Sequence, residues 1–293
     1  MLWRGLLALA VIAAGLGWYV TGAERVAEAD VPAHTPDLEN GALVFAIGGC
    51  ASCHVAPGAS DKTVLAGGLL IHSEFGTFAV PNISSDATHG IGAWSAADFL
   101  SAMKLGTAPD GRHYYPAFPF TAYARTRDGD LLDLFAYLKT LPADATPSAP
   151  HALGFPFSIS RGIGLWKLLY ATPDPVLPED GLSEAALRGR YLVEGPGHCA
   201  ECHTPRDALG GLDMARWMAG GPNPDGPGRI PNITPAKLTW SESDIAYYLE
   251  SGFTPDFDSA GGSMVAVIEN TAKLPPEDRA AIAAYLTALP PRE

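Results

Sequence analysis

The sequence CASCH at residues 50–54 recurs as CAECH at residues 199–203, and the two pentapeptides contain all four cysteines of this 293-residue chain. In both copies a histidine directly follows the second cysteine. Neither a disulfide nor a redox-active Cys-x-x-Cys pair needs that histidine, and the redox pair is typical of a β-α-β setting that this sequence lacks. Zinc ribbons separate their cysteine pairs by about 15–20 residues, so the much wider separation here disfavours a shared zinc site.

The histidine indicates a c-type haem in each half, because Cys-x-x-Cys-His is the signature of covalent haem attachment. Two thiols one helical turn apart can each add to a vinyl group of one porphyrin, and the adjacent imidazole then supplies the proximal iron ligand. We therefore predict two covalently bound haem c groups. The attachment residues are Cys50, Cys53, Cys199 and Cys202, and the proximal ligands are His54 and His203.

The two pentapeptides belong to a longer duplication. The tetrapeptide PNIS at residues 81–84 recurs as PNIT at 231–234, and Trp94-Ser95 recurs as Trp240-Ser241. Later in each copy, Ala-Tyr-Leu is followed by Leu-Pro, which ends at Pro142 in the first and at Pro290 in the second. The order of the motifs is kept with only small insertions, so the chain contains two copies of one unit of about 100 residues, a common domain size.

Each unit is predicted to be mostly helical. A short helix begins near Asp37 or Ser183, another follows Trp94 or Trp240, and a last helix has apolar residues at helical spacing before its closing proline. No segment alternates convincingly as a strand, so we expect an all-α fold. That fold would comprise two tandem class I cytochrome c-like domains and an N-terminal membrane helix. The predicted parts are residues 1–29 (anchor or signal), 30–142 (first domain), 143–182 (linker) and 183–293 (second domain).

Residues 5–21 form an uncharged, mostly apolar run preceded by Arg4. Its length fits the short end of a membrane-spanning helix, about 17–25 residues, and exceeds a signal-peptide core of about 7–15. An Ala-x-Ala pattern at residues 27–29 lies beyond intervening charges, so we favour an uncleaved anchor over a cleaved signal, with a buried globular helix as a third interpretation. With Arg4 in the cytoplasm, the body would lie at the periplasmic face of the bacterial inner membrane.

Six prolines in residues 143–182 predict a stiff, extended linker. Within it, residues 163–170 are largely apolar and predict a short helix. We favour packing of this helix between the two domains over contact with a membrane surface.

Composition excludes one class of partner. The chain has 32 acidic and 19 basic residues, a net charge of −13, and an apolar content of 47%. That apolar content supports a sizeable core, whereas the acidic balance leaves nothing to neutralise a run of phosphates. We therefore expect a folded protein with no nucleic-acid partner.

Methionine is the expected sixth iron ligand in the second unit. A soft thioether favours ferrous iron and raises the reduction potential. Met264 lies in the loop sequence GGSM, well downstream of His203, whereas Met214 and Met218 follow the cysteine motif too closely and are expected to pack or to lie on the surface.

The duplication gives a different prediction for the first unit. The residue that aligns with Met264 is Phe118, which cannot bind iron. Met103 aligns with Leu249 and is expected in the core, and His113 lies five residues before Phe118. The first haem is therefore expected to be five-coordinate, or ligated by His113 or Met103, and to differ from the second in potential and ligand access.

These motifs together resemble those of the membrane-anchored multi-haem cytochrome c subunits of periplasmic alcohol, sugar and aldehyde dehydrogenases. The resemblance covers nearly the whole chain after residue 35. It rests on the segments GCASCH (49–54), FGT (75–77), PNI (81–83), IGAWS (91–95), YPAFP (115–119) and GSM (262–264). In that family the loop ending Tyr-Pro-Ala often carries the axial methionine, where this chain has Phe118, and many relatives have three haem motifs rather than two.

The resemblance implies electron transfer from a dehydrogenase subunit or another donor to a respiratory acceptor, such as a quinol oxidase or a soluble cytochrome. Membrane attachment would come from the N-terminal helix. The alternative is a di-haem enzyme, such as a peroxidase, that uses a five-coordinate first haem. The first unit offers no evident acid–base pair beyond His113, so we favour an electron-transfer protein with no catalytic residues.

Overall fold

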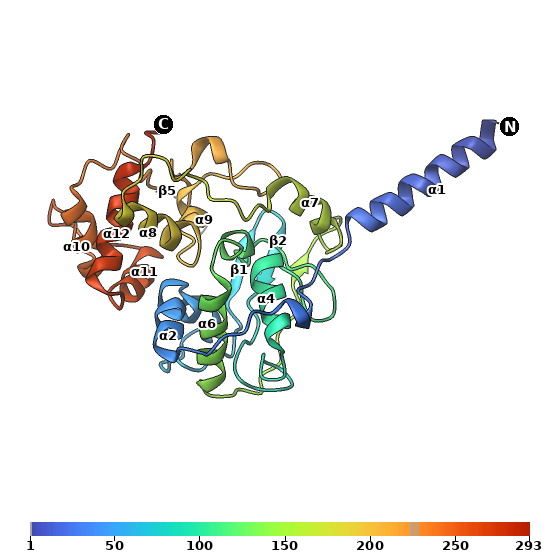
Figure 1. Ribbon diagram of the computed structural model, residues 1–293, viewed down its shortest axis with the longest axis horizontal. Helices are drawn as coiled ribbons and strands as arrows, with labels where there is room; N and C mark the ends of the chain where they lie inside the picture. The colour runs from blue at the N-terminus through green and yellow to red at the C-terminus, as the bar shows by residue number, and fades with distance from the viewer. Residues whose placement is uncertain (1, 224–225, 227) are drawn as a thin grey trace.

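The computed structural model describes residues 2–223, 226 and 228–293. Figure 1 shows two mostly helical lobes side by side and an N-terminal helix that projects away from them. The first lobe and the N-terminus contain α1 (Leu2–Val20), η1 (Glu28–Asp30), α2 (Leu38–Ile47), α3 (Cys50–His54), β1 (Leu70–Ser73), β2 (Gly76–Ala79), α4 (Ala96–Leu105), α5 (Phe120–Tyr123) and α6 (Asp128–Thr140). The linker contains β3 (Ala152–Leu153) and α7 (Gly162–Tyr170). The second lobe contains α8 (Glu184–Glu194), α9 (Ala200–His203), η2 (Met214–Arg216), β4 (Gly221–Pro222), β5 (Arg229–Ile230), α10 (Glu242–Ser251), α11 (Met264–Thr271) and α12 (Pro276–Ala288).

The first helix of each lobe begins where the sequence predicts. Asp37 caps α2 by accepting hydrogen bonds from the backbone of Glu39 and Asn40, and Ser183 caps α8 by accepting one from Ala186. Side-chain oxygens at this position satisfy backbone N–H groups that have no partner inside the helix.

The first and last helices of each lobe cross at a glycine. A β-carbon added to Gly41 of α2 would lie 2.7 Å from the carbonyl carbon of Asp133 in α6. One added to Gly189 of α8 would lie 2.6 Å from that of Ala281 in α12. Real β-carbons essentially never approach other atoms closer than 3.0 Å. The same close crossing therefore builds both lobes, and each crossing needs a residue without a side chain.

A second helix in each lobe repeats its boundaries in detail. Ser95 and Ser241 form capping boxes at the starts of α4 and α10, and Gly106 and Gly252 end these helices with φ of +57° and +75°. Glycine adopts this left-handed conformation without the steric penalty that a β-carbon brings. The helices predicted after Trp94 and Trp240 are confirmed.

The expectation of an all-α fold is wrong in one respect, because each half contains short antiparallel strands. Strand β1 pairs with β2, β2 pairs with β3 of the linker, and β4 pairs with β5. A β-carbon on Gly76 would collide with the linker strand, its nearest carbon being Cα of Leu153 at 3.0 Å. Strands of two to four residues are too short to show the alternation that identifies a strand in a sequence. The fold is two tandem helical domains with small hairpins.

The predicted linker helix is present as α7, and its inner face packs between the lobes. The Trp166 indole N–H donates to the carbonyl of Leu209 in the second lobe at 3.0 Å. Its ring lies edge-on to Phe120 of the first lobe, with centroids 6.1 Å apart. Lys167 donates to the carbonyls of Leu105 and Gly106 at 2.5 and 2.9 Å.

Helix α1 is long and apolar enough to cross a membrane, and none of the residues described in its window Trp3–Val20 is buried. The segment that follows it belongs to the first lobe. The Val26 N–H donates to the Ser101 hydroxyl at 2.9 Å, and Arg25 pairs with Asp98 and donates to the carbonyl of Pro109.

Candidate haem-binding sites

Each cysteine motif forms one short helix whose histidine is fixed by a backbone carbonyl. Nδ1 of His54 lies 2.8 Å from the carbonyl oxygen of Pro81, and Nδ1 of His203 lies 2.9 Å from that of Pro231. A carbonyl oxygen accepts a hydrogen bond only from a nitrogen that carries a proton. Nδ1 is therefore protonated, and Nε2 keeps its lone pair. This is the tautomer that a histidine needs in order to bind iron through Nε2, and the hydrogen bond fixes the orientation of the ring.

Burial keeps these imidazoles neutral. It lowers the pKa of His54 to about 4 and lowers that of His203, because the charged form is poorly solvated there. Burial also raises the pKa of the Cys50 and Cys199 thiols to about 12. A neutral imidazole and two thiols in one helical turn are the groups that thioether attachment and axial ligation require.

The turns that supply the carbonyls are held by asparagines. Asn82 accepts from the Ser84 N–H at 2.8 Å, and Asn232 accepts from the Thr234 N–H at 2.8 Å. Their amide groups donate to backbone carbonyls that follow the last helix of each unit, those of Asp144 and Arg292. The repeated PNIS and PNIT motifs are therefore structural turns that position the proximal histidines.

None of the four cysteines, all within the described part of the chain, forms a disulfide. Across the residues that the structure describes, no group of three or more His, Cys, Asp or Glu side chains is arranged to hold a metal ion.

The backbone confirms that Phe118 and Met264 occupy equivalent positions. The bridge between Thr107 and His113 in the first lobe has a counterpart between Phe253 and Ser259 in the second. Each bridge is extended by a hydrogen bond: Tyr114 N–H donates to the Gly106 carbonyl at 2.8 Å, and Ala260 N–H donates to that of Gly252 at 2.7 Å. In each of these pairs the residue of the second lobe is numbered 146 higher than its counterpart in the first, and the same difference separates Met264 from Phe118.

Met264 and Phe118 lie at corresponding edges of the two cores. Met264 is the first residue of α11 and packs, like Cys199, against the apolar core of the second lobe. Phe118 packs, like Cys50, against the core of the first lobe, and its ring centroid lies 5.6 Å from that of Tyr123.

The two other candidate ligands in the first lobe are engaged elsewhere. His113 is buried at the junction with the N-terminal segment, where its Nε2 lies 3.0 Å from the carbonyl oxygen of Thr21. Burial and the neighbouring charges of Lys167 and Arg161 lower its pKa. Met103 is buried in the first core, as Leu249 is in the second. Met218 is fully buried, whereas Met214 lies largely at the surface.

The two cysteine motifs meet at the interface between the lobes. Nε2 of His198, the residue before Cys199, lies 3.1 Å from the carbonyl oxygen of Gly48, two residues before Cys50. The Asn270 amide donates to the Ser52 hydroxyl between the first two cysteines, also at 3.1 Å.

His198 and Asn270 were missed by sequence reasoning, although His198 carried a signal. It occupies the position that Gly49 fills in the first copy of the repeat, and both residues have positive φ, +38° and +58°. A histidine where the other copy has a conformationally required glycine suggests a role for its side chain. Asn270 follows no motif of the repeat, so nothing in the sequence distinguishes it.

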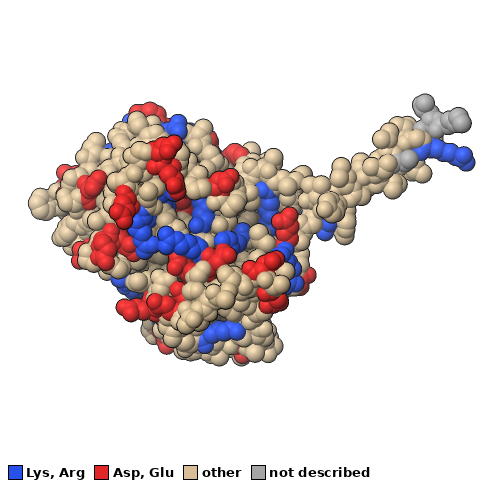
Figure 2. All heavy atoms as spheres, viewed as in Figure 1, with Lys and Arg blue, Asp and Glu red and all other residues tan. Residues whose placement is uncertain are grey.

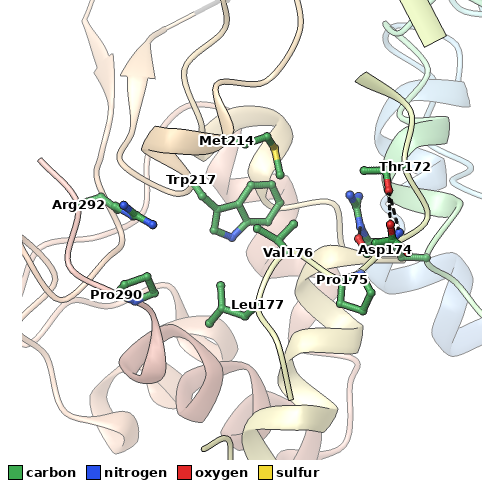
Figure 3. Close-up of a pocket in the computed structure, with 10 residues that line it drawn as sticks. Thr172, Asp174, Pro175, Val176, Leu177, Met214, Trp217, Pro290 and Arg292 are labelled. Atoms are coloured by element: carbon green, nitrogen blue, oxygen red, sulfur yellow. Dashed lines mark hydrogen bonds between the residues drawn. The ribbon is translucent and has the colours of Figure 1, made fainter. Parts of the chain in front are cut away.

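A separate pocket of about 340 Å³ lies where the linker crosses the second lobe (Figure 3). The linker residues Val176 and Leu177 face the indole of Trp217, with Met214 above and Pro290 opposite. No cysteine-motif residue and no Met264 atom lines this pocket among the residues described there. The linker is therefore bound along the second lobe at a place distinct from the attachment helix.

Comparison with known proteins places both halves in one family. The Cytochrome c family model matches residues 38–142 and again residues 186–290. The chain is 53% identical over 286 residues to a "Diheme cytochrome c-type" protein of Cereibacter sphaeroides, covering 97% of this chain and 96% of that protein.

Two further relatives are parts of dehydrogenases. The chain is 37% identical over 265 residues to the "Fructose dehydrogenase cytochrome subunit" of Gluconobacter japonicus, covering 88% of this chain and 54% of that protein. It is 34% identical over 275 residues to the "Alcohol dehydrogenase (quinone), cytochrome c subunit" of Gluconacetobacter polyoxogenes, covering 88% of this chain and 58% of that protein. The chain thus spans a little over half of the length of these two dehydrogenase relatives.

The duplicated attachment helices, their carbonyl-held histidines and these matches agree. The protein carries two covalently bound haem c groups, and it belongs to the cytochrome c family as a tandem di-haem member related to the cytochrome subunits of dehydrogenases.

Proposed function

We propose that this di-haem cytochrome accepts electrons from a dehydrogenase and delivers them to a respiratory acceptor at the periplasmic face of the inner membrane. The observation that carries the proposal is the meeting of the two attachment segments at His198 and Gly48. A route for electrons through both groups needs the attachment sites to be close and rigid. The hydrogen bond from Asn270 of α11 to Ser52 is a second link between the two lobes, and it contacts the first attachment helix directly.

The two sites would differ in ligation. We assign Cys50, Cys53 and His54 to the first haem and Cys199, Cys202 and His203 to the second, with Met264 as the sixth ligand of the second. For the first haem we propose an open sixth position, because Phe118 stands where Met264 stands, Nε2 of His113 lies against Thr21, and Met103 is part of the core. A thioether ligand raises the reduction potential, so the second site would be the more oxidising.

Retention of α1 as a membrane anchor is supported by the segment that follows it. Val26 and Val31 pack against the first core, and Arg25 pairs with Asp98. Cleavage after the Ala-x-Ala pattern at residues 27–29 would remove Arg25 and Val26 from the folded lobe. The intact mass of the protein purified from membranes tests this directly, and we expect a mass that includes residues 1–29.

The donor can be tested in membranes. Deletion of the gene should abolish oxygen consumption driven by one substrate, and the names of the relatives give the first set to try: fructose, an alcohol and gluconate. Restoring the wild-type gene should restore respiration, and Met264→Ala should restore little of it while leaving haem content unchanged. Unchanged respiration of the deletion strain on every oxidisable substrate would contradict the proposal.

The open sixth position also suggests a second candidate, a peroxidase. We favour electron transfer because His113, the acid–base candidate of the first lobe, is bound to the end of α1. Purified protein supplied with hydrogen peroxide and a reduced donor should therefore show no sustained turnover. Rapid peroxide consumption that is lost in a His54 variant would favour the enzyme instead.

A further inference from the structure

One face of the linker is apolar and uncovered. Leu165, Leu168 and Leu169 form one face of α7, and their exposed fractions are 58%, 60% and 65%. The loop before the helix adds Phe155 and Ile159, exposed to 84% and 53%. We call these five residues the linker patch. All five belong to one short stretch of the chain, residues 155–169, and large exposed apolar side chains on a protein surface indicate an interaction site.

The inner face of α7 shows that this exposure is not due to a loosely attached helix. Lys167 is hydrogen-bonded to the first lobe, and Trp166 bonds to one lobe and packs against the other. The Tyr170 hydroxyl donates to the Asp207 carboxylate of the second lobe at 2.7 Å. Because the face of α7 that carries Trp166, Lys167 and Tyr170 is bonded to the lobes, its three exposed leucines face solvent.

The linker patch adjoins the end of α1. Gly164 packs so closely on Thr21 that an added β-carbon would lie 2.9 Å from the Thr21 Cα. The Arg161 guanidinium lies over the ring of Trp18, 3.5 Å from its centroid, and bonds to the Trp18 carbonyl. Figure 1 shows α7 beside the base of the projecting helix, and the space-filling view in Figure 2 shows that helix standing clear of the lobes.

The length of α1 fixes the depth of this contact. Its 19 residues span about 28 Å, and the hydrocarbon core of a bilayer is about 30 Å thick. A helix that is no longer than the hydrocarbon core is thick must end at the lipid headgroups, so Thr21 would lie there. Trp18 and Tyr19 would then lie in the interfacial region that aromatic side chains favour. Gly164 touches Thr21, so α7 lies at headgroup depth as well.

We propose that the linker patch inserts into the outer surface of the same bilayer that α1 spans, as a second membrane contact that fixes the orientation of both lobes. Amphipathic helices bind membranes in this way, with apolar side chains below the headgroups and basic ones among them. Arg161, the N-cap residue of α7, is the basic residue that lies beside the end of α1. The proposal rests on anchoring by α1, which is part of the proposed function.

The full-length holoprotein in vesicles of phosphatidylethanolamine and phosphatidylglycerol gives a direct test. The vesicles contain a phosphatidylcholine with a light-activated carbene precursor in its acyl chain, and adducts are mapped by mass spectrometry. We expect adducts on α1 and on the linker patch, and none on Phe253 and Phe257, which are exposed to 53% and 97%. These two residues belong to the segment between α10 and α11, and Figure 1 shows those helices on the side of the second lobe away from α1. A variant with Leu165→Gln, Leu168→Gln and Leu169→Gln should lose most adducts on Phe155 and Ile159 while keeping those on α1.

The outcomes separate the two proposals. Adducts on α1 without adducts on the linker patch would overturn the second membrane contact and leave the anchor intact. Absence of adducts from both would refute the anchor itself. Labelling of the linker patch in vesicles by water-borne hydroxyl radicals, as strongly as Phe257, would show a face open to a protein partner and would also overturn the proposal.

Discussion

Replacing Gly189 by alanine tests whether the helix crossing determines the stability of the second lobe. The new methyl group would lie 2.6 Å from the carbonyl carbon of Ala281 and 2.8 Å from the β-carbon of Tyr285, and closer still to the Ala281 carbonyl oxygen. All three atoms are backbone or the root of a fully buried side chain, so no flexible group can move aside. Helices α8 and α12 would have to separate by roughly 1 Å.

Separation of two packed helices removes contacts along their whole length. Overpacking of a well-packed core usually lowers the free energy of unfolding by about 1–3 kcal/mol, and the backbone obstruction here places the effect near the upper end. For a domain of about 100 residues this lowers the melting temperature by roughly 4–8 °C for each kcal/mol. We expect a loss of about 3 kcal/mol, reduced slightly by the higher helix propensity of alanine.

Denaturant unfolding of the holoprotein measures the effect. Circular dichroism follows the helices, and the charge-transfer absorption expected from the proposed ligation of the second ferric haem by Met264 would follow the second lobe. Gly154→Ala is the matched control, because an added β-carbon there meets nothing within 4 Å and its φ is not positive. A Gly189→Ala protein as stable as this control would refute the reasoning that the crossing is sterically closed.

Three further predictions concern the first lobe, the acid stability and one strained residue. Phe118→Met should place a thioether at the position equivalent to Met264, so reduced protein should lose carbon monoxide binding in difference spectra; unchanged binding would contradict an open first site. Burial opposes ionisation of Asp133, but hydrogen bonds from the Asp37 backbone, Asn40 and His34 outweigh it and lower its pKa. Asp133→Asn should therefore lower the free energy of unfolding at neutral pH by about 1–3 kcal/mol. A carboxyl group with a lowered pKa contributes its full stabilisation above the unfolded pKa of about 3.9 and loses it as the pH falls through the folded pKa, so the denaturant curves of variant and wild type should converge in acid. Phe257 has φ of +64° and is 97% exposed, and the equivalent residue of the first lobe is Gly111. Phe257→Gly should therefore change the free energy of unfolding by less than about 1 kcal/mol. A larger loss of stability in thermal melts would indicate packing of Phe257 that the structure does not contain.

Much of the haem chemistry could be predicted because it follows from local sequence. The order Cys-x-x-Cys-His predicted two haem c groups, and the duplication predicted the equivalence of Phe118 and Met264 without any knowledge of the backbone. The helix starts at Asp37 and Ser183 were likewise predictable, since capping depends on residues a few positions apart.

The features that the sequence did not reveal depend on contacts between distant segments. The strands β2 and β3 pair residues that are far apart in the chain, and each is too short to show a period. The contact of His198 with Gly48 joins the two halves, so no pattern within one repeat predicts it. The apolar residues of α7 predicted a helix, but only the packing of Trp166 showed which of its faces remains uncovered.

The glycine crossing has a consequence for how the protein is made. Helices α2 and α6 that close the first lobe are both complete by residue 140, before any part of α8 has been synthesised. N-terminal domains generally fold first as a chain emerges. The first half can thus become compact while the second is still being synthesised. The hydrogen bond between His198 and Gly48 joins the two halves, so this contact can form only after the second half has been synthesised.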